Sequence, residues 1–392
     1  MQQVKPKTHI LPAIIIAQFL CTSLWFAGNA IITNLPLKAN HNEAFLGYLL
    51  SSVQFGFITG TLIFALFMIA DRYRPSKVFL LSALLAATCN LALLIPLNSI
   101  GYLLLARFGT GFFLAGIYPV GMKIAADYFD KGLGKALGYL VGALVLGTAF
   151  PHFIKGFNFG DYTTVIKTTS ILALLGGLII YLLVPNGPFR QKNKKLQLKA
   201  GVQLFKISAF KKAAFGYFGH MWELYAFWAF IPFALKNYSR LYNELFSISL
   251  WSFVIIAMGC ISCIIGGYFS QQVGNKKVAL VSLSLSGIFC LVSPLLFNLS
   301  LPLFLGLLCI WGMVVASDSP QFSTLIATAT PSNLKGTAFT LINCIGFAIS
   351  IISIQLLSYI SEKINPTIIF MILALGPIIG VVNLRKKLVV NN

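Results

Sequence analysis

Acidic residues are scarce in this chain of 392 residues. Nine Asp and Glu stand beside 29 Lys and Arg, and charged residues make up only 10% of the sequence, whereas hydrophobic residues make up 58%. The mean hydropathy is +0.86. Soluble globular domains carry about 25% charged residues, so this composition lies far outside their range. It indicates an integral membrane protein.

Other absences narrow the function further. The sequence contains no phosphate-binding glycine-rich loop, no zinc-ligand helix and no nucleophile elbow, and no soluble signalling domain. A membrane enzyme and a receptor are therefore disfavoured, and we expect no cofactor and no metal. The seven cysteines all fall in long apolar runs, where small packing residues are expected rather than redox or metal sites: Cys21, Cys89, Cys260, Cys263, Cys290, Cys309 and Cys344.

The apolar runs repeat along the whole chain. Each has about the 20 residues that a helix needs to cross the hydrocarbon core of a bilayer, whereas β-barrel strands would be about half as long and half polar. The fold class predicted is an all-α polytopic membrane protein. Twelve spans are expected, at 10–32, 45–70, 78–97, 102–126, 133–154, 164–184, 213–235, 246–269, 278–297, 301–328, 337–360 and 367–384.

The basic residues gather in alternate loops. Those expected on the cytoplasmic side are Lys5, Lys7, Arg72, Arg74, Lys77, Lys131, Lys135, Lys276, Lys277, Lys335, Arg385 to Lys387 and the run "RQKNKKLQLKAGVQLFKISAFKK". The opposite loops hold only Lys38, Lys155, Lys236, Arg240 and Lys363. This asymmetry predicts cytoplasmic N- and C-termini by the positive-inside rule. The net charge of +20 is thus a topology signal, and no nucleic-acid partner is expected.

The chain repeats itself at a spacing of about 200 residues. "FMIADRYRPSKVF" matches "GYFSQQVGNKKVA", and "GFFLAGIYP" from Gly111 matches "GMVVASDSP" from Gly312 at an offset of 201. We expect a six-helix bundle at 1–186, a basic linker at 187–212 and a second six-helix bundle at 213–392. Such repeats place a substrate site between two bundles that rock between inward-open and outward-open states. A monomeric transporter for a small molecule is predicted.

Two motifs carry a family resemblance. "ADRYRPSK" resembles the loop signature of the major facilitator superfamily, and "LLLARFGTGFFLAGIYP" is similar to its fourth-span signature, with Leu103, Arg107 and Gly111 in register. Phe67 and Arg74 depart from glycines of the loop signature. The resemblance covers nearly the whole chain and implies a multi-pass protein of the bacterial inner membrane.

Within that superfamily, "AGIYPVGMKIAADYF" and "GHMWELYAFW" look most like the bacterial nitrate, nitrite and cyanate porter-like branch. True nitrate porters of that branch carry an arginine in the second and eighth spans. This chain offers Gln54 in the second span and no basic residue in the eighth, so nitrate itself is not indicated.

Ionisable residues inside a span are costly and face protein or water. Glu223 and His220 are three apart on one helical face, and both side chains can exchange protons near neutral pH. We expect them to couple transport to protons. The alternative is a fixed hydrogen-bonded pair that ties two helices together.

Asp318 and Arg107 are the other deep ionisable residues. Asp318 lies beside a helix break before Pro320, where it could bind a proton, cap the broken helix or hold an arginine. Arg107 needs a carboxylate, backbone carbonyls or an anionic substrate, because it stays charged. The resemblance implies a proton-coupling role for Arg107, and a structural salt bridge is the alternative.

Polar and aromatic residues on the presumed cavity helices are candidates for substrate binding, with packing as the alternative for each aromatic: Trp25, Asn29, Gln54, Tyr118, Trp222, Gln321 and Asn343. Four charged residues near span ends are expected to form gating or structural ion pairs: Asp71, Arg72, Lys123 and Asp127. The amide side chains offer both donors and acceptors, which favours a polar organic solute that could be anionic.

The function predicted is secondary active transport by proton symport, with proton-coupled export as the alternative. The fifth span lacks the Gly-Pro pattern that many antiporters of the superfamily carry, which favours uptake. The partners expected are a small-molecule substrate, protons and the lipid bilayer.

Overall fold

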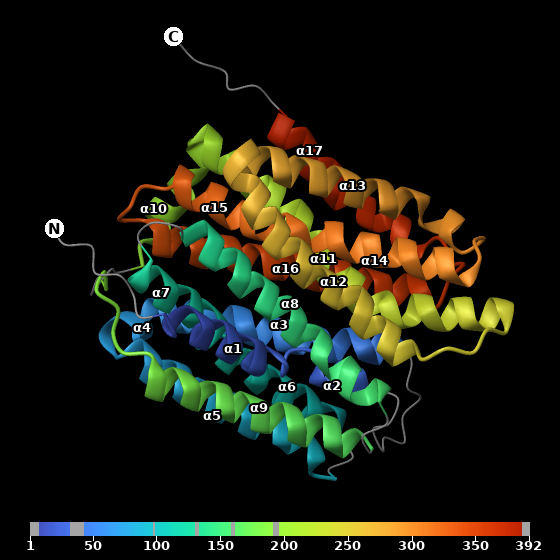
Figure 1. Ribbon diagram of the computed structural model, residues 1–392, viewed down its shortest axis with the longest axis horizontal. Helices are drawn as coiled ribbons and strands as arrows, with labels where there is room; N and C mark the ends of the chain where they lie inside the picture. Colours follow the sequence, from blue (N-terminus) through green and yellow to red (C-terminus); the bar gives the residue numbers. More distant parts are fainter. Residues whose placement is uncertain are drawn as a thin grey trace.

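A computed structural model describes residues 8–31, 43–96, 99–129, 133–157, 161–190 and 196–385. Over these residues the chain forms helices joined by short turns, and no strand occurs in them (Figure 1). The helices of the first half are α1 (Ile10–Thr22), α2 (Ala27–Ile31), α3 (Glu43–Leu66), α4 (Ile69–Arg72), α5 (Pro75–Leu91), α6 (Ile100–Leu114), α7 (Tyr118–Tyr128), α8 (Leu133–Gly156) and α9 (Tyr162–Leu183).

The second half follows after a short linker helix. Its elements are α10 (Leu198–Gln203), α11 (Ser208–Tyr242), α12 (Ile248–Val273), α13 (Asn275–Leu296), α14 (Leu301–Ser317), α15 (Ser319–Ala329), α16 (Lys335–Ser361), a 3-10 helix (Ile369–Ala374) and α17 (Leu375–Arg385). Two further 3-10 turns, Ala92–Leu94 and Leu204–Lys206, end α5 and follow α10.

Each of the twelve predicted spans corresponds to a helical pass. Nine helical segments in the described ranges are long and apolar enough to cross a membrane by length and composition. The ends of the first and third predicted spans, at 32 and 97, lie outside the described residues, as do Lys5, Lys7, Lys38, Lys131, 191–195 of the basic run and 386–387. The predicted fold class is confirmed.

Three passes are broken in the described residues, and two of the breaks have a proline as their cause. The fourth pass divides into α6 and α7 and the tenth into α14 and α15, and in both the second helix has a proline in its first turn, Pro119 and Pro320. Proline lacks the N–H that a continuous helix needs. The first pass divides at residues 23–26, between α1 and α2.

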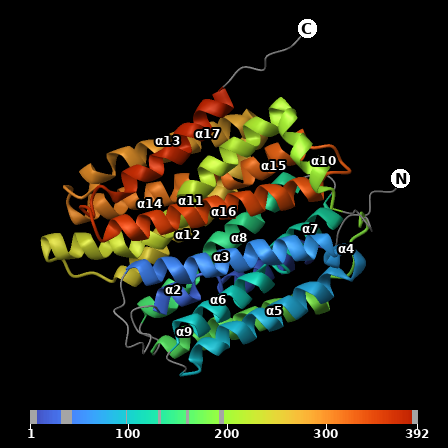
Figure 2. The same cartoon turned by 180° about the vertical axis from the view of Figure 1, so that it is seen from behind.

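The passes form two bundles, coloured blue to green and yellow to red in Figure 1 and seen from behind in Figure 2. In the first bundle α3 packs on α6 and α5 on α9, and in the second bundle α12 packs on α14 and α11 on α17. Two helix pairs join the bundles along their lengths, α8 with α12 and α3 with α16. The four aromatic rings described below meet at this boundary.

Two glycines show that the sequence repeat is a structural repeat. A Cβ atom on Gly111 of α6 would overlap the carbonyl oxygen of Val53 in α3, and one on Gly312 of α14 would overlap the carbonyl oxygen of Ile255 in α12. The two halves therefore use the same close backbone approach, which only glycine permits. The equivalent helices are the second and fourth passes and the eighth and tenth.

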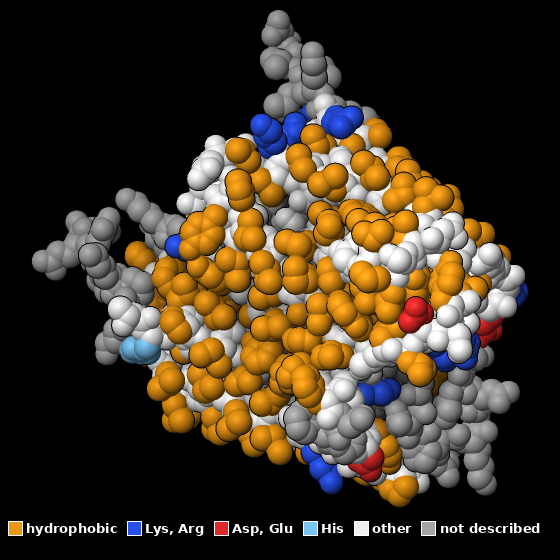
Figure 3. Space-filling view, turned by 45° about the vertical axis from the view of Figure 1, so that its right-hand side comes forward, with side chains coloured by type: hydrophobic (Ala, Val, Ile, Leu, Met, Phe, Trp, Pro, Cys, Tyr) orange, Lys and Arg blue, Asp and Glu red, His pale blue; other side chains and the backbone are white. Residues whose placement is uncertain are grey.

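The exterior is apolar over a broad band. Figure 3 shows hydrophobic side chains covering most of one face, with Lys and Arg gathered towards its edges. Large side chains such as Leu105, Leu182 and Leu295 are 63% to 71% exposed. This surface suits contact with lipid tails.

The turns after passes 2, 4, 6, 8 and 10 share one end of the molecule. We call it the basic end, because six basic residues lie in or beside these turns: Arg72, Arg74, Arg190, Lys276, Lys277 and Lys335.

Candidate functional site

Four aromatic rings meet at the boundary between the bundles, and we call them the interface cluster: Trp25 and Phe57 of the first bundle, Tyr225 and Phe347 of the second. The Trp25 ring centroid lies 4.9 Å from Phe57, 5.7 Å from Tyr225 and 5.5 Å from Phe347. Phe57 and Phe347 are 4.6 Å apart. All four rings are buried. Trp25 reaches this place because it lies in the break between α1 and α2, and the other three lie near the middle of long helices.

Unpaired hydrogen-bond donors lie on and around the interface cluster. The Gln54 side chain, one turn before Phe57 on α3, accepts a hydrogen bond from Ser350 of α16 at 3.0 Å through its carbonyl oxygen. Its Nε2 and the indole nitrogens of Trp25 and Trp228 are buried and have no hydrogen-bond partner among the described residues. Because buried polar groups in proteins are nearly always hydrogen-bonded, these donors are candidates to bind an acceptor-bearing ligand.

Glu223 is the centre of a polar cluster inside the second bundle. Its Oε1 accepts hydrogen bonds from the Ser286 hydroxyl, the Cys290 thiol at 3.3 Å and the Trp311 indole N–H at 3.0 Å. The side chain is 1% exposed. All three donors are neutral, and no Lys, Arg or His forms an ion pair with this carboxylate in the described parts of the chain. Ser286 and Cys290 are four residues apart, so α13 presents both on one face.

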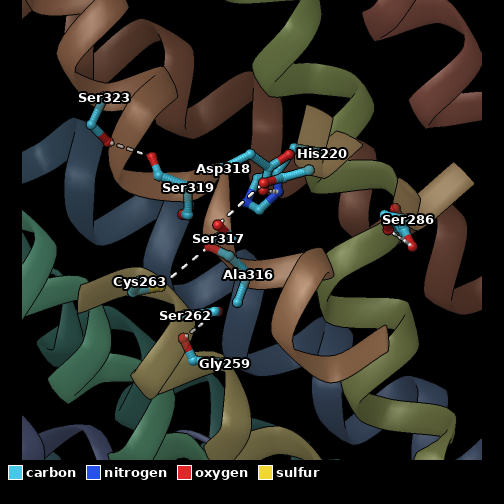
Figure 4. A network of polar contacts seen from close by, with 12 residues as sticks. His220, Gly259, Ser262, Cys263, Ser286, Ala316, Ser317, Asp318, Ser319 and Ser323 are labelled. Carbon is cyan, nitrogen blue, oxygen red and sulfur yellow. Dashed lines mark hydrogen bonds and ion pairs between the residues drawn. The ribbon is translucent and has the colours of Figure 1, made fainter. Parts of the chain in front are cut away.

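His220 pairs with Asp318. The two atoms His220 Nδ1 and Asp318 Oδ1 are 2.8 Å apart, and both side chains are 1% exposed. Figure 4 shows the pair where α14 passes into α15. Asp318 is the residue that separates α14 from α15, so its side chain lies at the break between the two helices. His220 Nε2 has no partner among the described residues. Glu223 and His220, expected from their spacing to act together, thus have separate partners in this structure.

Arg107 is fully buried in the first bundle, and no carboxylate of the described residues forms an ion pair with it. Its guanidinium donates hydrogen bonds to the carbonyl oxygens of Leu24 and Trp25 and to Asn90 Oδ1, the last at 3.2 Å. Asn90 in turn donates to Thr169 and Ser170 of α9. Of the three partners expected for Arg107, the structure shows backbone carbonyls. The arginine joins the broken first pass to α5, and the salt bridge that was the alternative role for it does not occur among the described residues.

The charged residues expected to gate lie at the basic end, within the first bundle. Lys123 Nζ of α7 is 3.0 Å from Asp71 Oδ1 and 3.6 Å from Asp127 Oδ1. Arg190 donates to the backbone oxygen of Asp71 at 3.1 Å. Arg72 is exposed. Because these contacts tie α4, α7 and the segment after α9 together without crossing to the second bundle, they support the structural alternative for the ion pairs.

The remaining predicted residues lie in different surroundings. Trp222 donates its indole N–H to the Ile372 oxygen at 3.2 Å, so it faces the last pass and not the cavity position expected for it. Asn343 accepts from the Tyr217 hydroxyl at 3.1 Å inside the second bundle. Gln321 is buried next to Gly266 of α12. Asn29 is buried with both amide atoms unpaired among the described residues, and Tyr118, half-buried, begins α7.

Several residues of these clusters were not among the predicted site residues. Asn90, Ser286 and Phe347 carry no charge and match no motif. For Ser286 and Cys290 the four-residue spacing in an apolar helix was an available signal. For Asn90 the signal was an amide in the middle of a long apolar run.

Two bundles of membrane-spanning helices, related by an internal repeat and meeting at a buried polar and aromatic boundary, define a membrane transporter of the two-bundle class. The sequence comparisons agree: the chain matches the Major Facilitator Superfamily over residues 14–354. The chain belongs to that superfamily, which is a family of transporters and not of enzymes.

A relative with a stated function is known at low identity. The chain is 22% identical over 311 residues to a bicyclomycin resistance protein homolog of Haemophilus influenzae, an alignment that covers 77% of each protein. The comparison gives no support to the resemblance to the nitrate, nitrite and cyanate porter-like branch, which rested on two short segments.

Proposed function

We propose that the protein is a proton-coupled transporter of a small polar organic solute that works by alternating access. The observation that carries this proposal is the Glu223 cluster. A lone ionised carboxylate in an apolar interior is costly, and among the described residues Glu223 has only three neutral donors to offset its charge. Binding a proton removes that charge, so Glu223 is suited to carry one proton per cycle.

The His220–Asp318 pair is the second proposed proton carrier. The imidazole Nδ1 and the carboxylate Oδ1 lie 2.8 Å apart at the break between α14 and α15. Adding or removing a proton changes the strength of this ion pair, and the break is a place where the helix can bend. Proton exchange there can therefore bias the position of α15 relative to α14.

The interface cluster is the proposed substrate site. It presents aromatic faces and unpaired donors. The Arg107 guanidinium beside it already donates to the carbonyl oxygens of Leu24 and Trp25 and to Asn90. Such a site favours a solute with apolar or planar parts and several hydrogen-bond acceptors. An anionic solute, which the sequence left open, is disfavoured because it would need a cation to balance its charge.

Export is the direction that the relative favours. The relative is named for bicyclomycin resistance. A transporter that removes a toxic compound from the cell would make the cell resistant to that compound. Uptake, predicted from the fifth span, is the second candidate. Both directions use the same proton carriers, so the coupling proposal does not depend on the choice.

Proteoliposomes containing a pH-sensitive dye test the coupling, with bicyclomycin as the first probe. A proton-coupled carrier moves protons when the solute is added, and Glu223→Gln should abolish this movement while solute exchange persists. Glu244→Gln, at an exposed acid after α11, is the matched control and should behave as the wild type. Proton movement that survives in Glu223→Gln would remove this residue from the mechanism.

We also propose the placement of the protein. By the positive-inside rule the basic end faces the cytoplasm, and the protein is a monomer of a bacterial inner membrane. Single cysteines added at Arg72 and at Glu244 test the orientation, because a membrane-impermeant maleimide applied to whole cells should label only the second.

A further inference from the structure

A groove of about 330 Å³ opens on the lipid-facing side of the second bundle. It lies between α12, α13 and α14, and its lining is mainly aliphatic and aromatic. Four of its residues, Ile265, Phe269, Val273 and Val281, are 44% to 56% exposed. Its volume is at the lower limit of cavities that bind small molecules, roughly 300 Å³. In a membrane protein, such a surface hollow faces lipid tails and not water.

The groove arises from a difference between the two repeats. In the first bundle Phe64 of α3 and Ser82 of α5 lie against Gly116, so the phenyl ring fills the space between the helices. In the second bundle Gly266 of α12 lies beside Ser317, whose hydroxyl is 3.1 Å from the Ser282 hydroxyl. Ser317 and Ser282 correspond to Gly116 and Ser82. Gly266 thus takes the place of a phenylalanine and leaves the groove open.

One end of the groove is cationic. Lys277 lines it and Lys276 precedes it, both exposed at the basic end. They lie in the first turn of α13, which has no acidic residue there and no side-chain cap. The first N–H groups of a helix have no partner within the helix and attract anions. An apolar groove thus ends at two lysines and a row of free backbone donors.

We infer that this groove is a binding site for an anionic phospholipid, with an acyl chain between α12, α13 and α14 and the phosphate at Lys277 and the start of α13. Charge and shape select this occupant, because lipid surrounds the opening and the cationic end lies at the level where headgroups occur. The floor of the groove includes Ser317, next to Asp318 (Figure 4). A bound chain therefore touches the segment that carries the His220–Asp318 pair.

The test is native mass spectrometry of the full chain, delipidated in detergent and titrated with dioleoyl phosphatidylglycerol. The wild type should bind one such lipid more tightly than the rest. Val281→Phe fills the groove, and we expect its Kd for this lipid to rise about tenfold. Lys277→Glu should raise Kd at least about fivefold, because each basic residue near a membrane surface strengthens binding to anionic lipid by roughly that factor.

Two matched variants control for a general change of surface. Ile288→Phe adds the same ring to another exposed position of α13, and Lys211→Glu reverses an exposed charge at the start of α11. Both should stay within about twofold of the wild type. Equal affinity in all five proteins would overturn the inference, and so would equally tight binding of dioleoyl phosphatidylcholine. Competition by glycerol 3-phosphate alone at matched concentration would show a phosphate site without a chain and would also overturn it.

Discussion

Tyr225 lies over Trp25 across the boundary of the two bundles, with ring centroids 5.7 Å apart and ring planes 29° apart. Trp25 belongs to the break in the first pass, and Tyr225 to the unbroken helix α11. Alternating access requires surfaces of the two bundles to separate in turn. A solute that replaces this stacked contact would be held by both bundles, which is what a central substrate site needs.

Trp25→Phe separates stacking from hydrogen bonding. Phenylalanine keeps an aromatic face against Tyr225 but removes the unpaired indole N–H. A hydrogen bond contributes about 0.5–1.5 kcal/mol, so we expect the apparent KM for the solute to rise roughly two- to twelvefold. The concentration dependence of solute-driven proton movement in proteoliposomes measures it.

Trp222→Phe is the matched control for that variant. It removes an indole N–H that donates to Ile372 in the last pass, so it should lower the melting temperature and leave KM unchanged. If the two variants change KM equally, the interface cluster is not where the solute binds.

The glycines of the repeat predict a stability effect shared by both halves. Gly111→Ala and Gly312→Ala each place a methyl group against a backbone carbonyl of the neighbouring helix. Overpacking of this kind costs about 1–3 kcal/mol. In Gly306→Ala the added methyl has no atom of the described residues within 4 Å, so this variant should be neutral or slightly stabilising. Thermal unfolding in detergent distinguishes these outcomes, and a melting temperature unchanged in the first two variants would contradict the close approach.

The fold was largely predictable because its signals are local and repeated. Twelve apolar runs, the matching glycines and Pro119 with its counterpart Pro320 are visible in the letters of the sequence. The break in the first pass was not predicted, since its residues "SLWF" contain neither proline nor glycine. The contacts that accompany that break come from Arg107, which lies 83 residues after Leu24 in the sequence. Helical periodicity cannot predict a contact between residues so far apart in the chain.

The site was predictable in its ionisable residues but not in their partners. Charges in apolar runs drew attention to Glu223, His220, Asp318 and Arg107. Spacing on one helix suggested that His220 and Glu223 act together. The structure instead joins His220 to Asp318, 98 residues away, because the packing of α11 against α15 decides which face each side chain meets.

Arg107 is expected to act on stability more than on coupling. Arg107→Met would leave Asn90 and the carbonyls of Leu24 and Trp25 without this donor. Each buried group that loses its partner costs about 1–3 kcal/mol, so the melting temperature should fall strongly. Arg107→Lys keeps a charged donor, so its melting temperature should fall less than that of Arg107→Met, and proton coupling should be retained.

An exposed arginine provides the comparison for Arg107. Arg240→Met, at the end of α11, should leave the melting temperature within error of the wild type. If Arg107→Lys folds with a normal melting temperature but moves no protons with the solute, the coupling role implied by the family resemblance is the correct one.

A disulfide across the boundary should stop transport. Gly47 of α3 and Ser358 of α16 lie towards the end opposite the basic end, and a Cβ atom on Gly47 would be 3.0 Å from that of Ser358. Disulfides join Cβ atoms about 3.5–4.5 Å apart, so Gly47→Cys with Ser358→Cys needs only a small adjustment. Nearby, Gln355 donates to the Ser51 hydroxyl at 2.7 Å, which holds the same two helices in register.

Oxidation of the double variant should fix α3 against α16 and prevent the bundles from separating there. We expect solute-driven proton movement to fall to the background of empty liposomes under oxidant and to return on reduction. Each single cysteine variant, treated identically, should remain active, which controls for the seven native cysteines. Full transport with the cross-link formed, verified by mass spectrometry, would show that α3 and α16 need not separate during the cycle.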